Sequence, residues 1–140
     1  MHITLIERKM MLTTEYLDAL PEIENKYEVD LQYGEKVVFT AEPTTFGNEK
    51  GRMLGLQGSK FTLTNRRIIA DNGVGVWTVD VPDDIVSCTK AEGGKSIFKS
   101  VYILVALNKQ IVFDEGKQRL TGFRFYFNKA DMARFEEILR

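Results

Sequence analysis

The sequence is poor in the residues that cross-link or ligate small folds. Its 140 residues include one cysteine, one histidine and three prolines. A lone Cys88 cannot form an intramolecular disulfide, and with only His2 beside it there is no set of Cys and His ligands for zinc. We therefore expect no disulfide framework, no metal and no cofactor, and nothing in the sequence demands an oxidising compartment.

Long apolar runs are missing as well. The longest, Val101–Leu107, has the length of a strand and falls far short of the ~18 residues that cross a membrane. The apolar stretch that begins at Ile3 is ended by charged residues from Glu7 onward, whereas a signal peptide needs about 7–15 apolar residues. We therefore expect a cytoplasmic chain without a transmembrane segment.

An excess of charge of either sign is also lacking. Nineteen basic residues face 20 acidic ones, so the net charge is −1 and no global field attracts nucleic acid. The apolar fraction of 44% and the charged fraction of 28% are those of an ordinary globular protein. The composition predicts one domain with a short appendage and no nucleic-acid partner.

Residues 1–33 have a helical pattern that the rest of the chain lacks. Thr13 or Thr14 can cap a helix that runs to Leu20, with an acidic residue in its first turn. Pro21 suits the first position of a second helix that ends near Glu28. We predict a helical N-terminal arm over 1–33, with the first nine residues as a loose tail.

After Gly34 the apolar pattern changes to period two, and turn residues follow at short intervals. Turns are predicted at 64–66, 71–73, 108–109 and 114–117, the first because Asn65 tolerates a positive φ. Near the end, alternation places Phe123, Phe125 and Phe127 on one face of a strand. The pattern predicts about seven short antiparallel strands.

The last thirteen residues return to helical spacing. Asn128 is a good N-cap, and one stripe of the helix carries Met132, Phe135, Ile138 and Leu139. A helix of about three turns is marginal by itself in water. It must therefore lie on a sheet or cap the opening of a barrel.

Three stretches resemble a known family. Gly58-Ser-Lys-Phe-Thr-Leu-Thr-Asn-Arg-Arg-Ile-Ile69 is similar to the G-x-L-x-L-T-x-x-R-[IL]-I segment of GRAM-type and bacterial pleckstrin-homology-like (PH-like) domains. Upstream, Gly34-Glu-Lys-Val-Val38 resembles their opening, and Val79-Asp-Val-Pro-Asp-Asp-Ile-Val86 resembles a strand-to-strand junction. The resemblance covers 34–140. It implies a mainly β fold, a PH-like barrel of about seven antiparallel strands capped by the C-terminal helix, in a cytoplasmic bacterial protein.

Candidate catalytic groups are few. Asp83 and Asp84 are adjacent in the chain, but neighbouring side chains of a strand point apart, so a turn or cap role is the better interpretation. Cys88 lies among apolar residues with no base nearby, which favours a packed thiol over a nucleophile. We do not expect an enzyme.

Two binding functions remain open. The resemblance implies protein interaction or homo-oligomerisation, and the arm offers Tyr16, Leu17 and Leu20 as contacts for a partner, unless it packs on its own barrel. Weak binding of anionic, phosphoinositide-type lipid is the alternative, because Lys50 and Arg52 lie in the loop that PH-like domains use for phosphates. Glu49 reduces the positive charge of that loop. We expect a non-catalytic binding module, with protein interaction ranked first.

Overall fold

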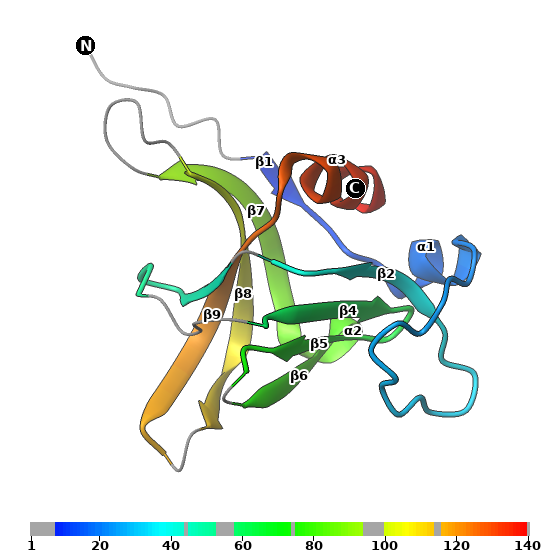
Figure 1. Ribbon diagram of the computed structural model, residues 1–140, viewed down its shortest axis with the longest axis horizontal. Coiled ribbons are helices and arrows are strands. Elements are labelled where there is room, and N and C mark those ends of the chain that lie inside the picture. The colour runs from blue at the N-terminus through cyan, green and yellow to red at the C-terminus, as the bar shows by residue number, and fades with distance from the viewer. Residues whose placement is uncertain are drawn as a thin grey trace.

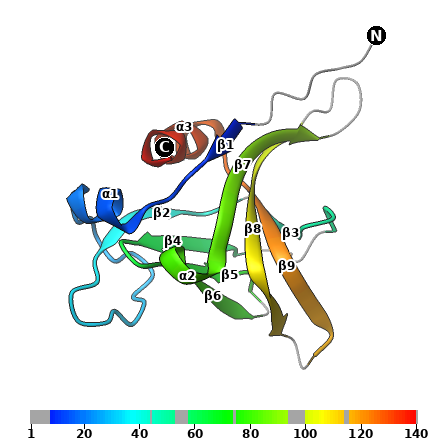
Figure 2. The same ribbon diagram turned by 180° about the vertical axis from the view of Figure 1, so that it is seen from behind.

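The protein is built from two antiparallel β-sheets and three helices (Figures 1 and 2). A computed structural model describes residues 8–43, 45–52, 58–73, 75–93, 100–113 and 116–139. The first sheet has the order β1-β7-β8-β9-β3 and contains β1 (Arg8–Met10), β3 (Thr45–Asn48), β7 (Ile85–Gly93), β8 (Ser100–Phe113) and β9 (Gln118–Tyr126). The second has the order β2-β4-β5-β6 and contains β2 (Val37–Ala41), β4 (Lys60–Thr64), β5 (Arg67–Asp71) and β6 (Val76–Asp80). The expected mainly β class is confirmed.

The two sheets meet differently at their two shared corners. At one corner β2 and β3 follow each other along the chain, but β2 pairs with β4 and β3 pairs with β9. At the other corner β6 pairs only with β5 among the described strands, and β8 continues past the start of β7. Hydrogen bonding therefore leaves the described strands as two open sheets, and a closed barrel stays a prediction.

Apolar residues of both sheets fill the space between them. Phe61 is fully buried, and its ring lies 4.6 Å from that of Phe125 and 5.7 Å from that of Phe135. On β9 the predicted alternation is confirmed: Phe123, Phe125 and Phe127 are buried, whereas Arg124 and Tyr126 lie on the other face. The alternating pattern thus defines the core correctly.

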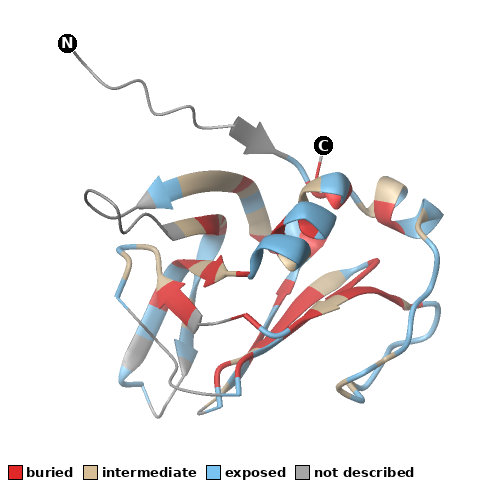
Figure 3. Cartoon of the chain, turned by 45° about the horizontal axis from the view of Figure 1, so that its top comes forward, coloured by how far each residue is buried: buried red, intermediate tan, exposed pale blue. Residues whose placement is uncertain are grey.

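The C-terminal helix α3 (Lys129–Ile138) covers one end of this core (Figure 3). The Asn128 side chain caps it by accepting the N–H of Asp131 at 2.8 Å. The predicted stripe is confirmed, because the side chains that it comprises are all buried: Met132, Phe135, Ile138 and Leu139. The helix is held by this apolar face, as expected for one too short to persist alone.

The N-terminal arm is only partly helical. Helix α1 (Thr14–Ala19) begins as predicted, with Thr13 Oγ1 accepting the N–H of Tyr16. The predicted second helix over 22–28 is wrong, because local bonds favour an irregular segment: the Asn25 side chain closes a loop onto Val29, and Ile23 N–H donates to Val37 O. The prediction of a loose tail over the first nine residues is wrong from Arg8 onward, because β1 begins there and pairs with β7. Residues 1–7 lie outside the described residues.

Three further predictions about the strands need correction. The predicted turn at 108–109 does not form, because β8 continues through these residues. The polar residues lie in a bulge between Ala106 and Ile111, where Asn108 Nδ2 donates to Asp83 O. An unexpected strand, β3, ends at Asn48 and runs into the loop that carries Lys50 and Arg52. Pro82 does not simply stop β6 but lies in a short helix, α2 (Val81–Asp84), where its missing N–H costs nothing. The described residues therefore form nine strands where about seven were expected.

Candidate functional site

The residues expected to contact a partner are largely used within the chain. Leu17 of α1 is fully buried in the core, and Leu20 is half-buried against it. The Tyr16 hydroxyl donates to Glu137 O of α3 at 3.3 Å. The structure thus has the arm packed on its own sheets, the other arrangement considered from the sequence.

The loop with Lys50 and Arg52 is a tight turn at the end of β3. Asn48 Oδ1 accepts the backbone N–H groups of both residues at 2.9 Å, and Asn48 N–H donates to Arg52 O. Gly51 occupies a positive φ of 91°, which favours glycine. Both basic side chains are exposed, so the sequence identified a well-formed cationic turn.

Glu49, expected to offset these cations, is directed elsewhere. Its Oε1 accepts the N–H of Thr121 at 2.7 Å and the Thr121 hydroxyl at 2.6 Å. Burial alone would raise the pKa of Glu49, but these bonds outweigh it and hold the pKa below its usual range. Behind the turn, Arg124 stacks on the Tyr102 ring at 4.4 Å and donates to Glu49 O. Nothing in the sequence indicates that this third cation lies at the turn.

The candidate catalytic groups Cys88 and Asp84 take part in packing and hydrogen bonding within the fold. Cys88 is fully buried, and burial raises the pKa of its thiol to about 12, so it stays protonated. Asp84 accepts the N–H of Asp80 at 2.7 Å and pairs with Lys109 at 2.9 Å, which braces α2. Within the part of the chain that the structure describes, no three His, Cys, Asp or Glu side chains gather as metal ligands would.

Two of the three stretches that carry the family resemblance contact each other. Asn65 Oδ1 accepts the N–H of Lys36 at 2.9 Å, and Asn65 N–H donates to Lys36 O. Asn65 is needed for these bonds and not for a positive φ, since Glu28 is the one non-glycine residue with φ between +20° and +160° in the described ranges. The 64–66 turn is thus confirmed, but the reason given for it was wrong.

Beside this turn lies a buried ion pair that the sequence did not reveal. Glu35, whose side chain is 0% exposed, accepts Arg67 Nε at 2.8 Å and Nη2 at 3.0 Å. It also accepts the Thr64 hydroxyl at 2.6 Å and the N–H of Gln32 at 2.9 Å. Burial would raise the pKa of Glu35, yet these donors lower it overall. The pair fixes the segment before β2 to the outer face of the β4–β5 hairpin.

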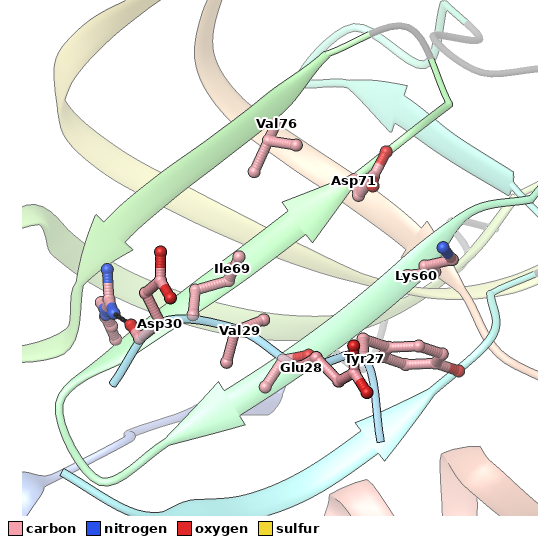
Figure 4. A pocket seen from close by; sticks show the side chains of 10 residues that line it. Tyr27, Glu28, Val29, Asp30, Lys60, Ile69, Asp71 and Val76 are labelled. Atoms are coloured by element: carbon pink, nitrogen blue, oxygen red, sulfur yellow. Dashed lines mark hydrogen bonds between the residues drawn. The ribbon is translucent and has the colours of Figure 1, made fainter. Parts of the chain in front are cut away.

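That segment roofs a cavity of about 310 Å³ on the outer face of the four-stranded sheet (Figure 4). Residues 27–30 cross above the strands, while Ile69 and Thr62 form the floor. Carboxylates approach it from Glu28, Asp30 and Asp71, and the basic groups are Lys60 and Arg67. The cavity therefore combines an apolar floor with charged walls.

Strand β6 borders this cavity and is a sheet edge. Val81 N–H donates to Arg66 O, so these two residues form a hydrogen-bonded pair at the end of the β5–β6 ladder. Hydrogen-bonded and non-hydrogen-bonded pairs alternate along an antiparallel ladder. Val76 and Thr78 therefore belong to non-hydrogen-bonded pairs and direct their N–H and C=O away from β5. Among the described residues these four groups have no hydrogen-bond partner, whereas the outward N–H of Asp80 is taken by Asp84. Val76 is 59% exposed, so the edge is accessible beside the cavity.

A second hollow of about 610 Å³ lies between α3 and the β7–β8 strands. Val101, Phe127 and Met132 line it, together with Lys90 and Glu136, which pair at 2.6 Å. The adjacent edge of β7 is already paired with β1 as far as Lys90. This groove therefore adjoins an edge that another strand already occupies from Cys88 to Lys90.

Helices of the described ranges are all too short or too polar to cross a membrane. Comparisons with protein-family models, with curated proteins and with solved structures found no match.

Proposed function

We propose that this chain is a non-catalytic, PH-like binding module that holds an extended segment of another protein at the edge of β6. The order of its elements supports the PH-like part of the proposal. The four-stranded sheet, in the order β6-β5-β4-β2, continues through the corner between β2 and β3 into the other sheet, in the order β3-β9-β8-β7. Helix α3 covers one end of the core. The contact between the two resembling stretches, at Lys36 and Asn65, gives their residues a common structural role.

The single observation that carries the function is the row of unpaired backbone groups on β6. Natural proteins usually protect such edges with charges, bulges or covering segments, because an open edge pairs with other chains. Here the edge residues Val76 and Thr78 carry no charge, and the nearest charged strand residue is Asp80. An incoming strand would satisfy all four groups by adding to the sheet.

A second copy of this chain suits the edge less well than a different protein does. If two β6 strands paired antiparallel about Thr78, Asp80 of one copy would lie opposite Val76 of the other. Asp71 sits directly across the sheet from Val76, so like charges would gather on one face. Light scattering of the free protein, measured alongside the test below, distinguishes homo-oligomerisation from binding of another protein.

Selection of linear peptides from a random displayed library tests the proposal. Thr78→Pro removes one outward N–H without breaking the β5–β6 ladder, because proline is tolerated at an edge. Thr78→Val is the matched control that keeps the N–H. Selected peptides should bind the wild type and Thr78→Val and should lose at least tenfold in affinity with Thr78→Pro. Equal binding to all three proteins would refute strand addition at β6.

Weak binding of anionic lipid is the second candidate, favoured by the withdrawal of Glu49 to Thr121. The turn then presents Lys50 and Arg52 while the charged Glu49 carboxylate is bound to Thr121, and each basic residue near an anionic leaflet contributes about 1 kcal/mol. Vesicles with phosphatidylserine or phosphoinositide should pellet the wild type weakly, and Lys50→Glu/Arg52→Glu should abolish pelleting. Lys26→Glu/Lys129→Glu, with the same change of charge elsewhere, is the control. Pelleting that both double variants lose equally would argue against a site at the turn.

A further inference from the structure

We infer that the segment held at β6 is basic, and that one of its lysine or arginine side chains enters the cavity beneath residues 27–30; the inference rests on the proposed function. Strand addition alone recognises only a backbone, so specificity must come from side chains beside the edge. The cavity of Figure 4 is the hollow that adjoins β6 on its outer face.

Strand geometry brings one side chain of the partner to the cavity. Paired residues of neighbouring strands point to the same face of a sheet, so the residue opposite Val76 would point outward as Val76 does. Asp71 lies across from Val76 on β5. Each cross-strand step is about 5 Å, so the partner residue starts about 10 Å from Asp71. Only a long side chain bridges that distance, and it would lie over the exposed Val76.

The charges of the cavity select a cation for that side chain. Of its two basic groups, Arg67 is already neutralised by Glu35 and also donates to Asp30 O. Lys60 lies 5.7 Å from the centre of the Tyr27 ring and is paired in register with Asp71. The carboxylates of Glu28, Asp30 and Asp71 therefore outnumber the cations left to balance them.

The floor of the cavity favours the same choice. Ile69 is 8% exposed, and Val29 is half-buried beside it, so an aliphatic stem can pack there. Arginine offers a planar, permanently charged fork that can meet two carboxylates at once, and the volume of about 310 Å³ accommodates it. A phosphate or other anion would meet uncompensated carboxylates at the same place.

A pair of synthetic peptides tests the inference. Both have ten residues and alternate threonine with a second residue, which is arginine in one and its neutral isostere citrulline in the other. The wild type should bind the arginine peptide about tenfold more tightly, which corresponds to about 1.4 kcal/mol. The preference should weaken as ionic strength rises, because exposed ion pairs are screened by salt.

Variants separate this inference from the proposed function. Asp71→Asn keeps an oxygen to accept the Gly73 N–H, which donates to Asp71 Oδ1 at 2.8 Å, so the turn survives while the charge is lost. It should remove most of the preference for arginine and leave citrulline-peptide binding unchanged. Asp83→Asn, which removes an exposed carboxylate that does not line the cavity, should change neither.

The outcomes that overturn each claim differ. If both peptides bind equally but Thr78→Pro still abolishes binding, the inference fails and the proposed function survives. If Thr78→Pro leaves the binding of both peptides unchanged, or if neither peptide binds the wild type, strand addition at β6 is refuted together with the inference.

Discussion

Over residues 61–64 of β4, the two faces of the four-stranded sheet are equally buried but are stabilised in different ways. On β4, Phe61 and Leu63 face inward and are 0% exposed, while Thr62 and Thr64 face outward at 2% and 0%. The inner face contacts aromatic rings, whereas the outer face meets the Glu35–Arg67 pair and the crossing segment. Burial alone therefore does not reveal what stabilises a residue: apolar area does so on one face, and completed hydrogen bonds do so on the other.

The largest expected effect comes from emptying the inner face. Phe61→Ala should lower the free energy of unfolding by about 3–5 kcal/mol, through lost transfer energy and the cavity left behind. Urea unfolding followed by fluorescence of Trp77, the one tryptophan, measures it. Val86→Ala, at a side chain 54% exposed, is the control and should cost under about 0.5 kcal/mol. Similar midpoints for both variants would contradict the assignment of the inner face.

Breaking the pair on the outer face should cost somewhat less. Glu35→Ala leaves Arg67 half-buried without its carboxylate and removes the nearer of the two acceptors of the Thr64 hydroxyl, so a loss of about 2–3 kcal/mol is expected. The double variant Glu35→Leu/Arg67→Leu should lose less than the two single losses combined. Arg66→Leu breaks only the exposed pair with Asp18 and should cost about 0.5 kcal/mol or less. Strictly additive losses would show that the two side chains do not interact.

Acid should weaken the outer face selectively. The pKa of Glu35 is lowered in the folded protein, so folding is favoured by its ionised form above the unfolded pKa of about 4.3. That contribution disappears as the pH falls through the lower folded pKa. The free energy of unfolding should therefore drop less between pH 5 and pH 3 for Glu35→Gln than for the wild type. A parallel drop would mean that Glu35 titrates alike in both states.

The smallest expected effect concerns the segment that crosses the outer face. Glu28 has a φ of +52°, a left-handed conformation that costs most residues about 1–2 kcal/mol. Glu28→Gly relieves this strain but adds freedom to the unfolded chain, so a net gain of under about 1 kcal/mol is expected. Thermal unfolding detects it as a slightly raised Tm. Glu24→Gly, in the same segment without positive φ, should be neutral or destabilising.

The apolar core between the sheets could be predicted from the sequence because its information is local. Alternation of period two placed Phe123, Phe125 and Phe127 correctly, and the helical stripe of α3 was read from Met132 and Phe135. Apolar patterning needs no partner residue to be identified, since any apolar neighbour of suitable size fills the core. The turn residues before β5 and β6 were equally local signals.

The outer face could not be predicted because its information is distant. Glu35 and Arg67 are 32 residues apart, and nothing in either one indicates the other. Short β3 and β1 were missed because they are stabilised by pairing with β9 and β7, not by their own propensity. For the candidate site, the sequence indicated the charged loop with Lys50 and Arg52. It could not indicate the open edge of β6, because an edge is defined by the absence of a pairing strand.

The placement of α3 has a consequence for how the protein is made. This last helix supplies Phe135 to a cluster that includes Phe39, and it accepts a hydrogen bond from Tyr16, 121 residues earlier. A nascent chain on the ribosome therefore cannot complete this aromatic interior until α3 has emerged. Until then the sheets expose rings to solvent, so a translation pause before α3 emerges would prolong a state that chaperones recognise.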